Sequence, residues 1–535
     1  MQQKAHSVAS FAQIPDGGML AVQVDGEKVL LLRDGSSVTA VSGTCTHAGG
    51  PLSEGVRHGN RIICPWHKAA FCNRTGEVLD PPAVDSLPSF SVRVEAGHVL
   101  VSVPPAKPVL PKPSNDKRCF VIIGAGAAGA VAAQTLREAG FGGRIVMLDH
   151  ENRVPYDRTI LSKYFLAGSE SGEKSPLQTQ SFYNNKGIER LTATVQHIDI
   201  RDRRIDFSDG SSISYDAALV ASGGSPTHPQ LPGADLGNAF VLRSRADADA
   251  ILAQAERSAS AVVVGASFIG MEVAASLRER GLAVTVVAKD KVPFAARFGE
   301  PVGKAFQALH EQKGVEFRLN SEIASLQGDK TVRSVLLKSG EQITTDLVIF
   351  GFGMTPSTTF ASELPRTDDG GILVDSWLRA SDTVYAAGDI ACFPYSGEQD
   401  PIRVEHWRVA QQQGRIAALN MLGQAKRYDA VPVFWTIQYL KRLDYIGQAR
   451  EWDDLIIHGD IKKLEFLSYY VKDGKVLAAA GVGRDQDTAA LGELFEMQKT
   501  WAPETLGDSP AKLLESLNQK AADDWDKSKF EITAD

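Results

Sequence analysis

The chain has 535 residues, of which 43% are hydrophobic and 23% are charged, and its formal net charge at pH 7 is -8. This composition excludes a disordered chain, and the acidic balance argues against a general nucleic-acid binder. No apolar run approaches the roughly 20 residues that a membrane-spanning helix needs, and residues 1–20 lack the pattern of a secretory signal. Of the five cysteines, Cys72, Cys119 and Cys392 are scattered along the chain, which fits a reducing compartment. We therefore expect a multidomain cytoplasmic protein without membrane insertion.

The N-terminal part is predicted to form an all-β domain. Short apolar or alternating runs, such as Met19–Val24 and Ser89–Glu95, are separated by turn residues. Five prolines between Pro104 and Pro113 then indicate a semi-rigid spacer. We place the first domain at residues 1–104 and the spacer at residues 105–117.

Two Cys-His pairs are the most informative feature of this domain. Cys45 is followed by His47, and Cys64 by His67, with sixteen residues between the two pairs. Two thiolates and two imidazoles suit a 2Fe-2S cluster in which one iron takes both sulfurs and the other takes both ring nitrogens. The alternative is a structural zinc site, but zinc sites usually place Cys beside Cys and His beside His.

These two segments resemble the ligand loops of Rieske ferredoxin domains. Respiratory-chain Rieske proteins carry an additional cysteine in each loop, and these two cysteines form a disulfide. Here the corresponding positions are Gly50 and Trp66. The resemblance is therefore to the soluble ferredoxin type.

A glycine-rich turn follows the spacer. It consists of Gly124, Gly126 and Gly129, and it lies between a buried-strand pattern and an alanine-rich helical stretch. Such glycines let the backbone approach a pyrophosphate at the positive end of the helix. The next strand leads to Asp149 and Glu151, where an acidic group can accept a hydrogen bond from a ribose.

The same unit recurs about 140 residues later. Gly265 and Gly270 keep the outer glycine positions, Ser267 replaces the middle one, and the next strand leads to Lys289 and Asp290. Two such units imply two dinucleotides. The simplest pair is a tightly held flavin and an exchangeable nicotinamide, because a hydride donor and its acceptor must meet at one point.

Several later segments resemble pyridine-nucleotide-dependent flavoproteins. Tyr215–Gly224 and Val384–Asp389 resemble their two flavin-contact strands, and Pro155–Arg158 resembles a segment of oxygenase reductases and apoptosis-inducing factor. From residue 118 onward the chain is similar to that ferredoxin reductase group. The whole chain resembles its subgroup with a fused N-terminal Rieske domain.

This resemblance implies a multidomain fold. The all-β Rieske domain is followed by two α/β Rossmann-like dinucleotide-binding domains and a small α+β C-terminal domain. The expected FAD domain is discontinuous, at residues 118–240 and 357–425. The expected NAD(P)H domain covers residues 241–356, and the C-terminal domain covers residues 426–535.

The resemblance also implies site residues. The expected cluster ligands are Cys45, His47, Cys64 and His67. Those expected at FAD are Gly124, Gly126, Gly129, Asp149, Glu151, Arg158, Lys163, Gly223, Gly388, Asp389 and Trp435. Those expected at the nicotinamide nucleotide are Gly265, Phe268, Gly270, Glu272, Asp290, Gly353, Glu405 and His406. Of these, Phe268, Glu272 and Trp435 are expected near the reacting rings. Without the resemblance, Glu272 is equally compatible with a helix-surface charge, and Trp435 with a core aromatic.

The expected reaction is electron transfer from NAD(P)H. NADH is favoured because a carboxylate at Asp290 would repel a 2′-phosphate, whereas a Lys289 that faces the ribose would favour NADPH. The chain has no Cys-x4-Cys pair, which excludes a flavin-disulfide reductase, so electrons leaving the flavin need another acceptor. The natural path runs from the nicotinamide through FAD and the cluster to an external one-electron acceptor protein, an oxygenase or haem monooxygenase. The chain would act as a monomer or homodimer. Two alternatives are a redox-gated interaction protein of the apoptosis-inducing-factor type and a direct NAD(P)H-dependent reductase of a small molecule.

Overall fold

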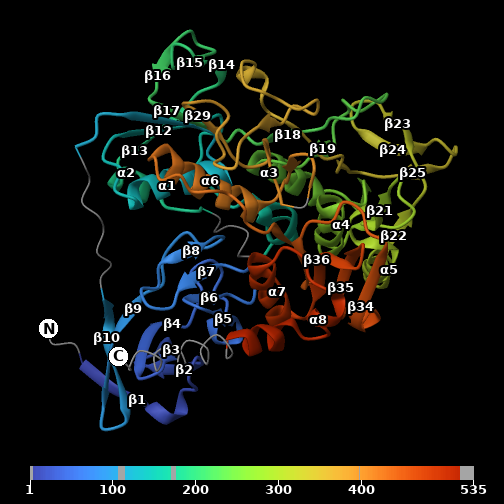
Figure 1. Ribbon diagram of the computed structural model, residues 1–535. Coiled ribbons are helices and arrows are strands. Elements are labelled where there is room, and N and C mark those ends of the chain that lie inside the picture. The colour runs from blue at the N-terminus through green and yellow to red at the C-terminus, as the bar shows by residue number, and fades with distance from the viewer. Residues whose placement is uncertain (1–3, 107–114, 170–175, 397, 519–535) are drawn as a thin grey trace.

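The computed structural model describes residues 4–106, 115–169, 176–396 and 398–518. Figure 1 shows the chain running from the N-terminal β domain, in blue, through two α/β units to a C-terminal unit in red. The fold class predicted from the sequence is confirmed. Most of the predicted spacer lies outside the described residues.

The N-terminal domain contains two antiparallel sheets. The larger has the order β1-β10-β9-β4-β3-β2 and the smaller the order β5-β6-β7-β8. The strands of the larger sheet are β1 (Lys4–Ser10), β2 (Met19–Val24), β3 (Glu27–Asp34), β4 (Ser37–Ser42), β9 (Ser89–Glu95) and β10 (His98–Ala106). Those of the smaller sheet are β5 (Val56–His58), β6 (Arg61–Ile63), β7 (Ala70–Cys72) and β8 (Val78–Asp80), and the short helices are η1 (Phe11–Gln13) and η2 (Leu52–Glu54).

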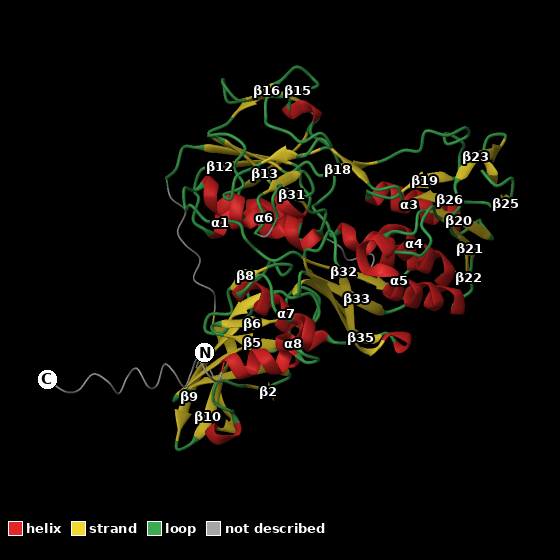
Figure 2. Ribbon diagram, turned by 45° about the vertical axis from the view of Figure 1, so that its right-hand side comes forward, coloured by secondary structure: helices red, strands yellow, loops and turns green. Residues whose placement is uncertain are grey.

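The first α/β unit is built on a parallel five-stranded sheet of order β13-β12-β11-β17-β29. Its strands are β11 (Cys119–Ile123), β12 (Arg144–Asp149), β13 (Ile188–Thr192), β17 (Ala217–Val220) and β29 (Val384–Ala386). Helices α1 (Ala127–Glu138) and α6 (Trp407–Met421) lie side by side below this sheet in Figures 1 and 2. The remaining elements are η3 (Arg158–Ile160), η4 (Leu161–Phe165), α2 (Gln180–Asn185), β14 (Val195–Asp199), β15 (Arg204–Phe207), β16 (Ser212–Ser214), η6 (Thr359–Ala361), β28 (Ile372–Leu373), β30 (Ala391–Phe393) and β31 (Ile402–Arg403).

The second α/β unit repeats this plan with the order β19-β26-β20-β21-β22. Its strands are β19 (Ala239–Val241), β20 (Ser260–Val264), β21 (Ala283–Val287), β22 (Val315–Arg318) and β26 (Val348–Phe350). Its helices are α3 (Arg245–Ala255), α4 (Phe268–Glu279) and α5 (Ala295–Gln312). A three-stranded meander adds β23 (Ile323–Gly328), β24 (Val332–Leu337) and β25 (Gln342–Thr344), and β18 (Gly224–Pro226) pairs with β27 (Met354–Pro356) between the units. Since β19 pairs in this sheet, the second unit begins slightly before residue 241.

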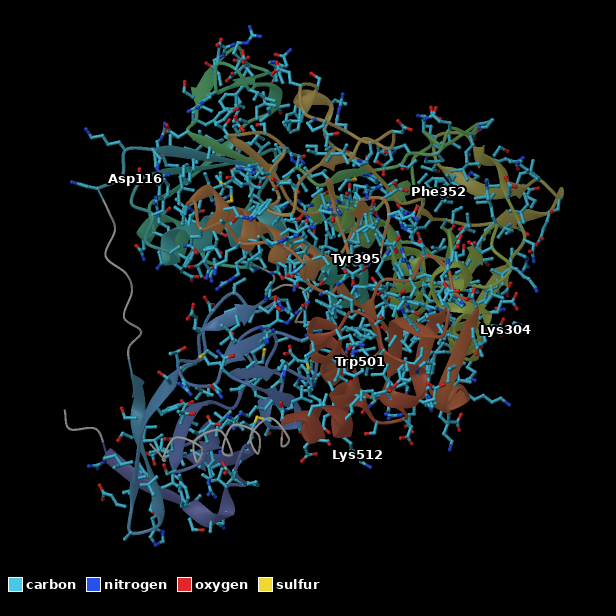
Figure 3. All side chains as sticks on the ribbon, in the orientation of Figure 1. Asp116, Lys304, Phe352, Tyr395, Trp501 and Lys512 are labelled. Atoms are coloured by element: carbon cyan, nitrogen blue, oxygen red, sulfur yellow. The ribbon has the colours of Figure 1, made fainter. Side chains whose placement is uncertain are left out.

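The C-terminal unit is an antiparallel sheet of order β32-β33-β36-β35-β34, covered by helices. Its elements are β32 (Val433–Gln438), β33 (Lys441–Gly447), β34 (Asp454–Asp460), η7 (Ile461–Lys463), β35 (Glu465–Lys472), β36 (Lys475–Val482), α7 (Asp485–Met497) and α8 (Pro503–Leu506), and residues 510–518 are also helical. Trp501, labelled in Figure 3, fixes the segment after α7, because its indole N–H donates to the Leu494 carbonyl at 2.9 Å. No helix in the described ranges is long and apolar enough to cross a membrane.

The N-terminal domain packs directly against the C-terminal unit (Figure 1). Ile63 and Ala70 of the small sheet share an apolar cluster with Ala489 of α7. Beside this cluster, the Lys68 ammonium lies 2.7 Å from the Asp444 carboxylate, and both residues are only 2% exposed. The cluster-bearing domain is therefore docked on the rest of the chain and not merely tethered to it.

Candidate redox site

Cys45 and Cys64 supply the sulfur half of the predicted cluster site. Cys45 follows β4 and Cys64 follows β6, and their exposed fractions are only 3% and 2%. The side-chain hydrogen bond between them is the main reason that the pKa of the Cys64 thiol is lowered to about 7. Backbone N–H groups of Trp66 and His67 act in the same direction. The same hydrogen bond, together with burial, raises the pKa of the Cys45 thiol, so Cys64 is the sulfur that ionises first. The fold thus brings two sulfurs together and makes one of them readily ionised, which is the form that binds a metal.

His47 and His67 supply the nitrogen half. Their ring centroids lie 4.8 Å apart in an edge-to-face arrangement, and Nδ1 of His47 is buried with no hydrogen-bond partner in the described structure. Burial lowers the pKa of both imidazoles, most strongly for His67. Both rings are therefore neutral at pH 7, which is the form that binds a metal.

The arrangement fits a two-iron cluster better than one zinc ion. Within the described residues, no three His, Cys, Asp or Glu side chains lie close enough together to hold a single metal ion. A two-iron cluster needs only two protein ligands at each iron. At Gly50, an added Cβ would lie 2.8 Å from Cys64 Sγ, so this position has no room for the extra cysteine of respiratory-chain Rieske proteins.

Trp435 of the C-terminal unit contacts the histidine half of this site. Its ring centroid lies 4.5 Å from that of His67 and 6.3 Å from that of His47. Trp435 stands directly opposite Asp444 across the β32–β33 pair, so both side chains are on the face that meets the docked domain. The sequence predicted Trp435 near the flavin, and the structure places it against the cluster ligands.

The first glycine turn forms an open cradle at the start of α1. Gly124 has a φ of 112°, and an added Cβ would lie 2.2 Å from the Ala221 carbonyl. A Cβ on Gly129 would lie 1.9 Å from the Gly124 carbonyl, whereas one on Gly126 would meet nothing within 4 Å. The outer glycines therefore permit the tight turn and helix packing, and the middle one leaves room for a pyrophosphate.

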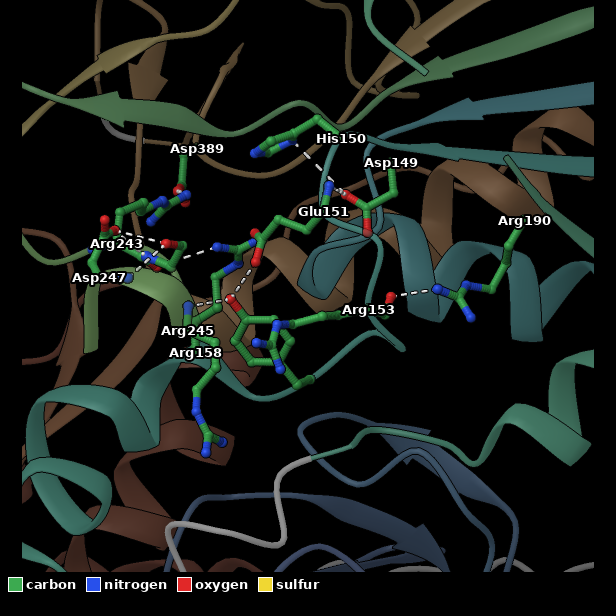
Figure 4. Close-up of polar contacts among 12 residues, drawn as sticks. Asp149, His150, Glu151, Arg153, Arg158, Arg190, Arg243, Arg245, Asp247 and Asp389 are labelled. Carbon is green, nitrogen blue, oxygen red and sulfur yellow. Dashed lines mark hydrogen bonds and ion pairs between the residues drawn. The ribbon is translucent and has the colours of Figure 1, made fainter. Parts of the chain in front are cut away.

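Acidic and basic side chains gather beside this cradle, as Figure 4 shows. Glu151 accepts from the Tyr156 hydroxyl at 2.9 Å and from the Arg158 guanidinium at 2.5 Å. Asp149 accepts from the Glu151 amide at 3.1 Å, and burial is the main reason that its pKa is raised. Arg158 therefore contacts Glu151 in this structure, and the two residues form one polar group at the end of β12.

Asp389 has a basic partner that the sequence did not suggest. The Arg243 guanidinium donates to the Asp389 carboxylate at 3.0 Å. The same guanidinium packs on Gly223, where an added Cβ would lie 2.9 Å from its nitrogen. Next to Asp389, the Gly388 amide donates to the Gln413 side chain at 2.8 Å. These two hydrogen bonds connect the segment after β29 with Arg243, which precedes α3, and with α6.

Lys163 and Glu272 form a buried ion pair across the two α/β units. The Lys163 ammonium lies 2.8 Å from the Glu272 carboxylate, and Glu272 is 4% exposed. This burial excludes the reading of Glu272 as a helix-surface charge. The pair lies between η4 and α4, where the two nucleotide-binding units meet.

The second glycine turn has the same backbone path as the first. Gly265 has a φ of 106°, and a Cβ on Gly270 would lie 2.1 Å from the Gly265 carbonyl. Ser267 and Asp290 are exposed, as is Gly353, at which a Cβ would meet nothing within 4 Å. Phe352, labelled in Figure 3, is 42% exposed and follows β26, the parallel neighbour of β20. This cradle is thus more open than the first.

An aromatic group lies between the second cradle and the C-terminal unit. Phe268 and Phe434 meet at a centroid distance of 5.0 Å, and His406 stacks on Phe434 at 3.9 Å. The dense surroundings of His406, together with the charge of Arg297, lower its pKa to about 3. His406 is therefore a neutral stacking partner at pH 7. Glu405 points elsewhere and pairs with the Arg403 guanidinium.

Comparisons with known proteins agree with this architecture. Residues 119–414 match the family model described as pyridine nucleotide-disulphide oxidoreductase, residues 4–91 match the Rieske [2Fe-2S] domain, and residues 433–517 match the reductase C-terminal domain. Apoptosis-inducing factor 3 of Mus musculus is 36% identical over 508 residues, which cover 91% of this chain and 83% of that protein. This chain belongs to the Rieske-fused pyridine nucleotide-disulphide oxidoreductases. The 2Fe-2S cluster is thereby confirmed over the zinc alternative.

Other members of the family show what the reductase portion does. A ferredoxin-NAD(P)+ reductase of Sphingomonas sp is 35% identical over 72% of this chain and 94% of that protein. The reductase in the covalent putidaredoxin reductase-putidaredoxin complex superposes with a TM-score of 0.71 at 28% identity, over 76% of this chain and all of that one. The present chain is therefore an FAD-dependent NAD(P)H oxidoreductase that carries a 2Fe-2S cluster and transfers electrons to an iron-sulfur centre.

Proposed function

We propose that this chain takes electrons from NADH on FAD and passes them singly, through its own Rieske cluster, to an external acceptor protein. The acceptor would be an oxygenase or haem monooxygenase, and the chain would act as a monomer or homodimer in the cytoplasm. A bound flavin supplies the needed chemistry, because it accepts a hydride and releases single electrons. The observation that carries the proposal is the contact of Trp435 with His67 at 4.5 Å.

The docked position of the N-terminal domain supports an internal route. Trp435 belongs to the same strand as Phe434 and Thr436, and side chains alternate between the faces of a strand. Thr436 donates to Glu272 at the junction of the nucleotide-binding units, while Trp435 lies against the cluster ligands. One strand therefore joins the expected flavin region to the cluster.

Buried charges hold the two parts together. Arg408 of α6 donates to the Pro81 carbonyl at 2.9 Å and lies 3.2 Å from the Asp80 carboxylate. With Lys68 and Asp444, this gives two buried basic residues that bridge the docked domain and the reductase. Breaking a buried pair is costly, about 3 to 5 kcal/mol, because one charge is left without a partner. The interface thus keeps the cluster beside Trp435.

Specific roles follow for the side chains around the nucleotides. The first cradle, with Glu151 and Arg158, would hold the adenosine half of FAD, and Arg243 with Asp389 would contact the rest of that cofactor. Lys163 and Glu272 would flank the reacting rings. In the second cradle Asp290 would accept from the adenosine ribose of NADH and repel a 2′-phosphate, which favours NADH over NADPH.

The test compares two acceptors in a variant that lacks the cluster. Cys45→Ser removes one ligand, and Cys72→Ser is the matched control, because Cys72 lies on β7 of the same domain but is not among the four ligands. We expect Cys45→Ser to reduce ferricyanide, which can take electrons directly from flavin, while cytochrome c reduction falls severely. Cys72→Ser should keep both activities.

Equal retention of both activities in Cys45→Ser would contradict the relay and favour a direct flavin reductase. Absence of turnover with either acceptor in the unmodified chain would instead favour a redox-gated interaction protein. Flavin content, measured in each variant, shows that the reductase portion is intact. Substitution is preferable to deletion of residues 1–104, because deletion would expose the buried Asp444 carboxylate.

A further inference from the structure

Glu272 is held by side chains from two other elements besides its own helix. Its Oε2 atom accepts from the Lys163 ammonium at 2.8 Å and from the Ser162 hydroxyl at 2.5 Å, both on η4. Its Oε1 atom accepts from the Thr436 hydroxyl of β32 at 2.6 Å. A carboxylate with three donors at two oxygens has one defined orientation.

The hydrogen bonds continue beyond Thr436 into the protein interior. The side-chain amide of Gln438 donates to the Thr436 hydroxyl oxygen at 3.0 Å. The carbonyl oxygen of the same amide lies 3.2 Å from Nε2 of His310 on α5. Thr436 and Gln438 are each 1% exposed and His310 is fully buried. The series of hydrogen bonds from His310 to Glu272 is therefore shielded from solvent.

The chemistry of each group determines which atom donates and which accepts in this series of hydrogen bonds. An ionised Glu272 can only accept, so Thr436 must donate to it and must itself accept from the Gln438 amide. The Gln438 oxygen then faces His310, which must carry its proton on Nε2. Burial lowers the pKa of His310 to about 4, so the ring is neutral at pH 7 and carries one N–H. Nδ1 of His310 has no hydrogen-bond partner in the described structure, so the series of hydrogen bonds ends at this ring.

We propose that Thr436, Gln438 and His310 are positioning residues for hydride transfer, which they assist by holding the Glu272 carboxylate against Lys163. This inference rests on the proposed function, in which Lys163 and Glu272 flank the reacting rings. These three residues act only through Glu272, because Thr436 is the one among them that contacts the ion pair. They also link α5 of the nicotinamide-binding unit to the C-terminal strand that carries Trp435.

Two further ionisable groups near Glu272 belong to η4. Lys163 is in direct contact, and Tyr164 is close enough that the Glu272 charge helps to raise the pKa of the phenol, with burial as the larger cause. Neither group contacts Thr436 through a hydrogen bond in the described structure. A change at Thr436 therefore reaches the ion pair through the Glu272 carboxylate.

The experiment is a double-mutant cycle in the holoenzyme, measured by single-turnover reduction of the flavin by NADH. Thr436→Val removes the hydroxyl and keeps the shape, whereas Thr436→Ser keeps the hydroxyl. Thr345→Val is the matched control, because Thr345 is equally buried but donates to the Leu347 backbone carbonyl. Dissociation constants for FAD and NADH are measured for every variant.

We expect Thr436→Val to lower the limiting rate about tenfold, the effect of losing a hydrogen bond to a charged group. Both dissociation constants should change by less than about twofold, and Thr436→Ser and Thr345→Val should stay near the unmodified rate. Added to Glu272→Gln, Thr436→Val should cost less than about twofold more, because the two residues act as one unit.

Three results would overturn the inference. These are an unchanged rate in Thr436→Val, an equal loss in Thr436→Ser, and a full tenfold loss on top of Glu272→Gln. The rate of flavin reduction and the two dissociation constants all belong to steps before electron transfer to an external acceptor. Failure to reduce cytochrome c would therefore overturn the proposed function without affecting this measurement.

Discussion

The two glycine cradles share a backbone path but differ in what surrounds them. In both, the first glycine has a φ above 100° and the third packs its Cα against the carbonyl of the first. The first cradle has glycine at the middle position and the second has Ser267. The acidic residue beyond the first cradle, Glu151, is held by Tyr156 and Arg158, whereas Asp290 beyond the second is exposed.

Such a difference allows one fold to bind two ligands with different residence times. A preorganised set of charged hydrogen bonds lowers the cost of binding and favours a ligand that stays. An exposed acid on an open cradle suits a ligand that enters and leaves in each cycle. This contrast agrees with the proposal that the first cradle holds resident FAD and the second an exchanging nicotinamide nucleotide.

The largest expected effects come from the third glycine of each cradle. In Gly129→Ala the new Cβ would lie 1.9 Å from the Gly124 carbonyl, and in Gly270→Ala it would lie 2.1 Å from the Gly265 carbonyl. Such overpacking costs about 3 kcal/mol, or about 100-fold in affinity. We expect Gly129→Ala to lose FAD and Gly270→Ala to keep FAD but lose NADH binding. Loss of FAD in both variants would contradict the assignment of separate cradles.

A smaller effect is expected at the polar group beside the first cradle. Arg158→Ala removes the guanidinium that holds Glu151 and should weaken FAD binding by about 10- to 30-fold, because a charged hydrogen bond is worth about 1.5 to 2 kcal/mol. Arg153→Ala is the control, since Arg153 belongs to the same segment but is exposed. Fluorescence titration of the apoprotein with FAD measures both. Equal affinities in the two variants would argue against preorganisation by Arg158.

The next effect distinguishes the two nicotinamide nucleotides. Asp290→Ala should lower kcat/KM for NADH about tenfold, the value of one lost charged hydrogen bond, with little loss for NADPH. Lys289 is the competing residue, because its charge would attract a 2′-phosphate, but its ammonium lies 3.3 Å from the Glu322 carboxylate. Lys289→Ala should therefore leave the nucleotide preference unchanged. A ratio of kcat/KM that favours NADPH in the unmodified chain would overturn the NADH assignment.

The smallest effect is expected at the middle position of the second cradle. Ser267 is exposed, and its hydroxyl lies 3.4 Å from the Gly351 carbonyl, which is a weak contact. Ser267→Gly should change the dissociation constant of NADH by less than about twofold. A gain of tenfold or more in NADH affinity, measured by fluorescence titration, would mean that the serine side chain limits the approach of the nucleotide.

Local patterns predicted much of this molecule. The strands Met19–Val24 and Ser89–Glu95 occur with these bounds as β2 and β9, and each predicted glycine-rich turn lies between a strand and a helix. β1 (Lys4–Ser10) was not predicted, since its polar composition lacks a clear alternation. The cluster, both nucleotide cofactors and the family were also correctly predicted from the residues and the resemblance they carry.

Contacts between distant segments could not be predicted in this way. The meeting of Trp435 with His67 joins residues more than 360 positions apart, as does that of Lys68 with Asp444. Arg243 and Thr436 have no motif of their own, and only the tertiary structure brings them to Asp389 and Glu272. Such positions depend on how domains pack, which spacing along a chain does not encode.

In the proposed reaction, electrons pass from the nicotinamide to the cluster within one polypeptide chain. Anaerobic single-turnover mixing with NADH, followed at the flavin and cluster absorbances and by electron paramagnetic resonance, tests it directly. We predict that the flavin is reduced first and the Rieske cluster second, at a rate that does not depend on protein concentration. A cluster that stays oxidised beside reduced flavin, or a rate of cluster reduction that rises in proportion to protein concentration, would contradict electron transfer within one chain.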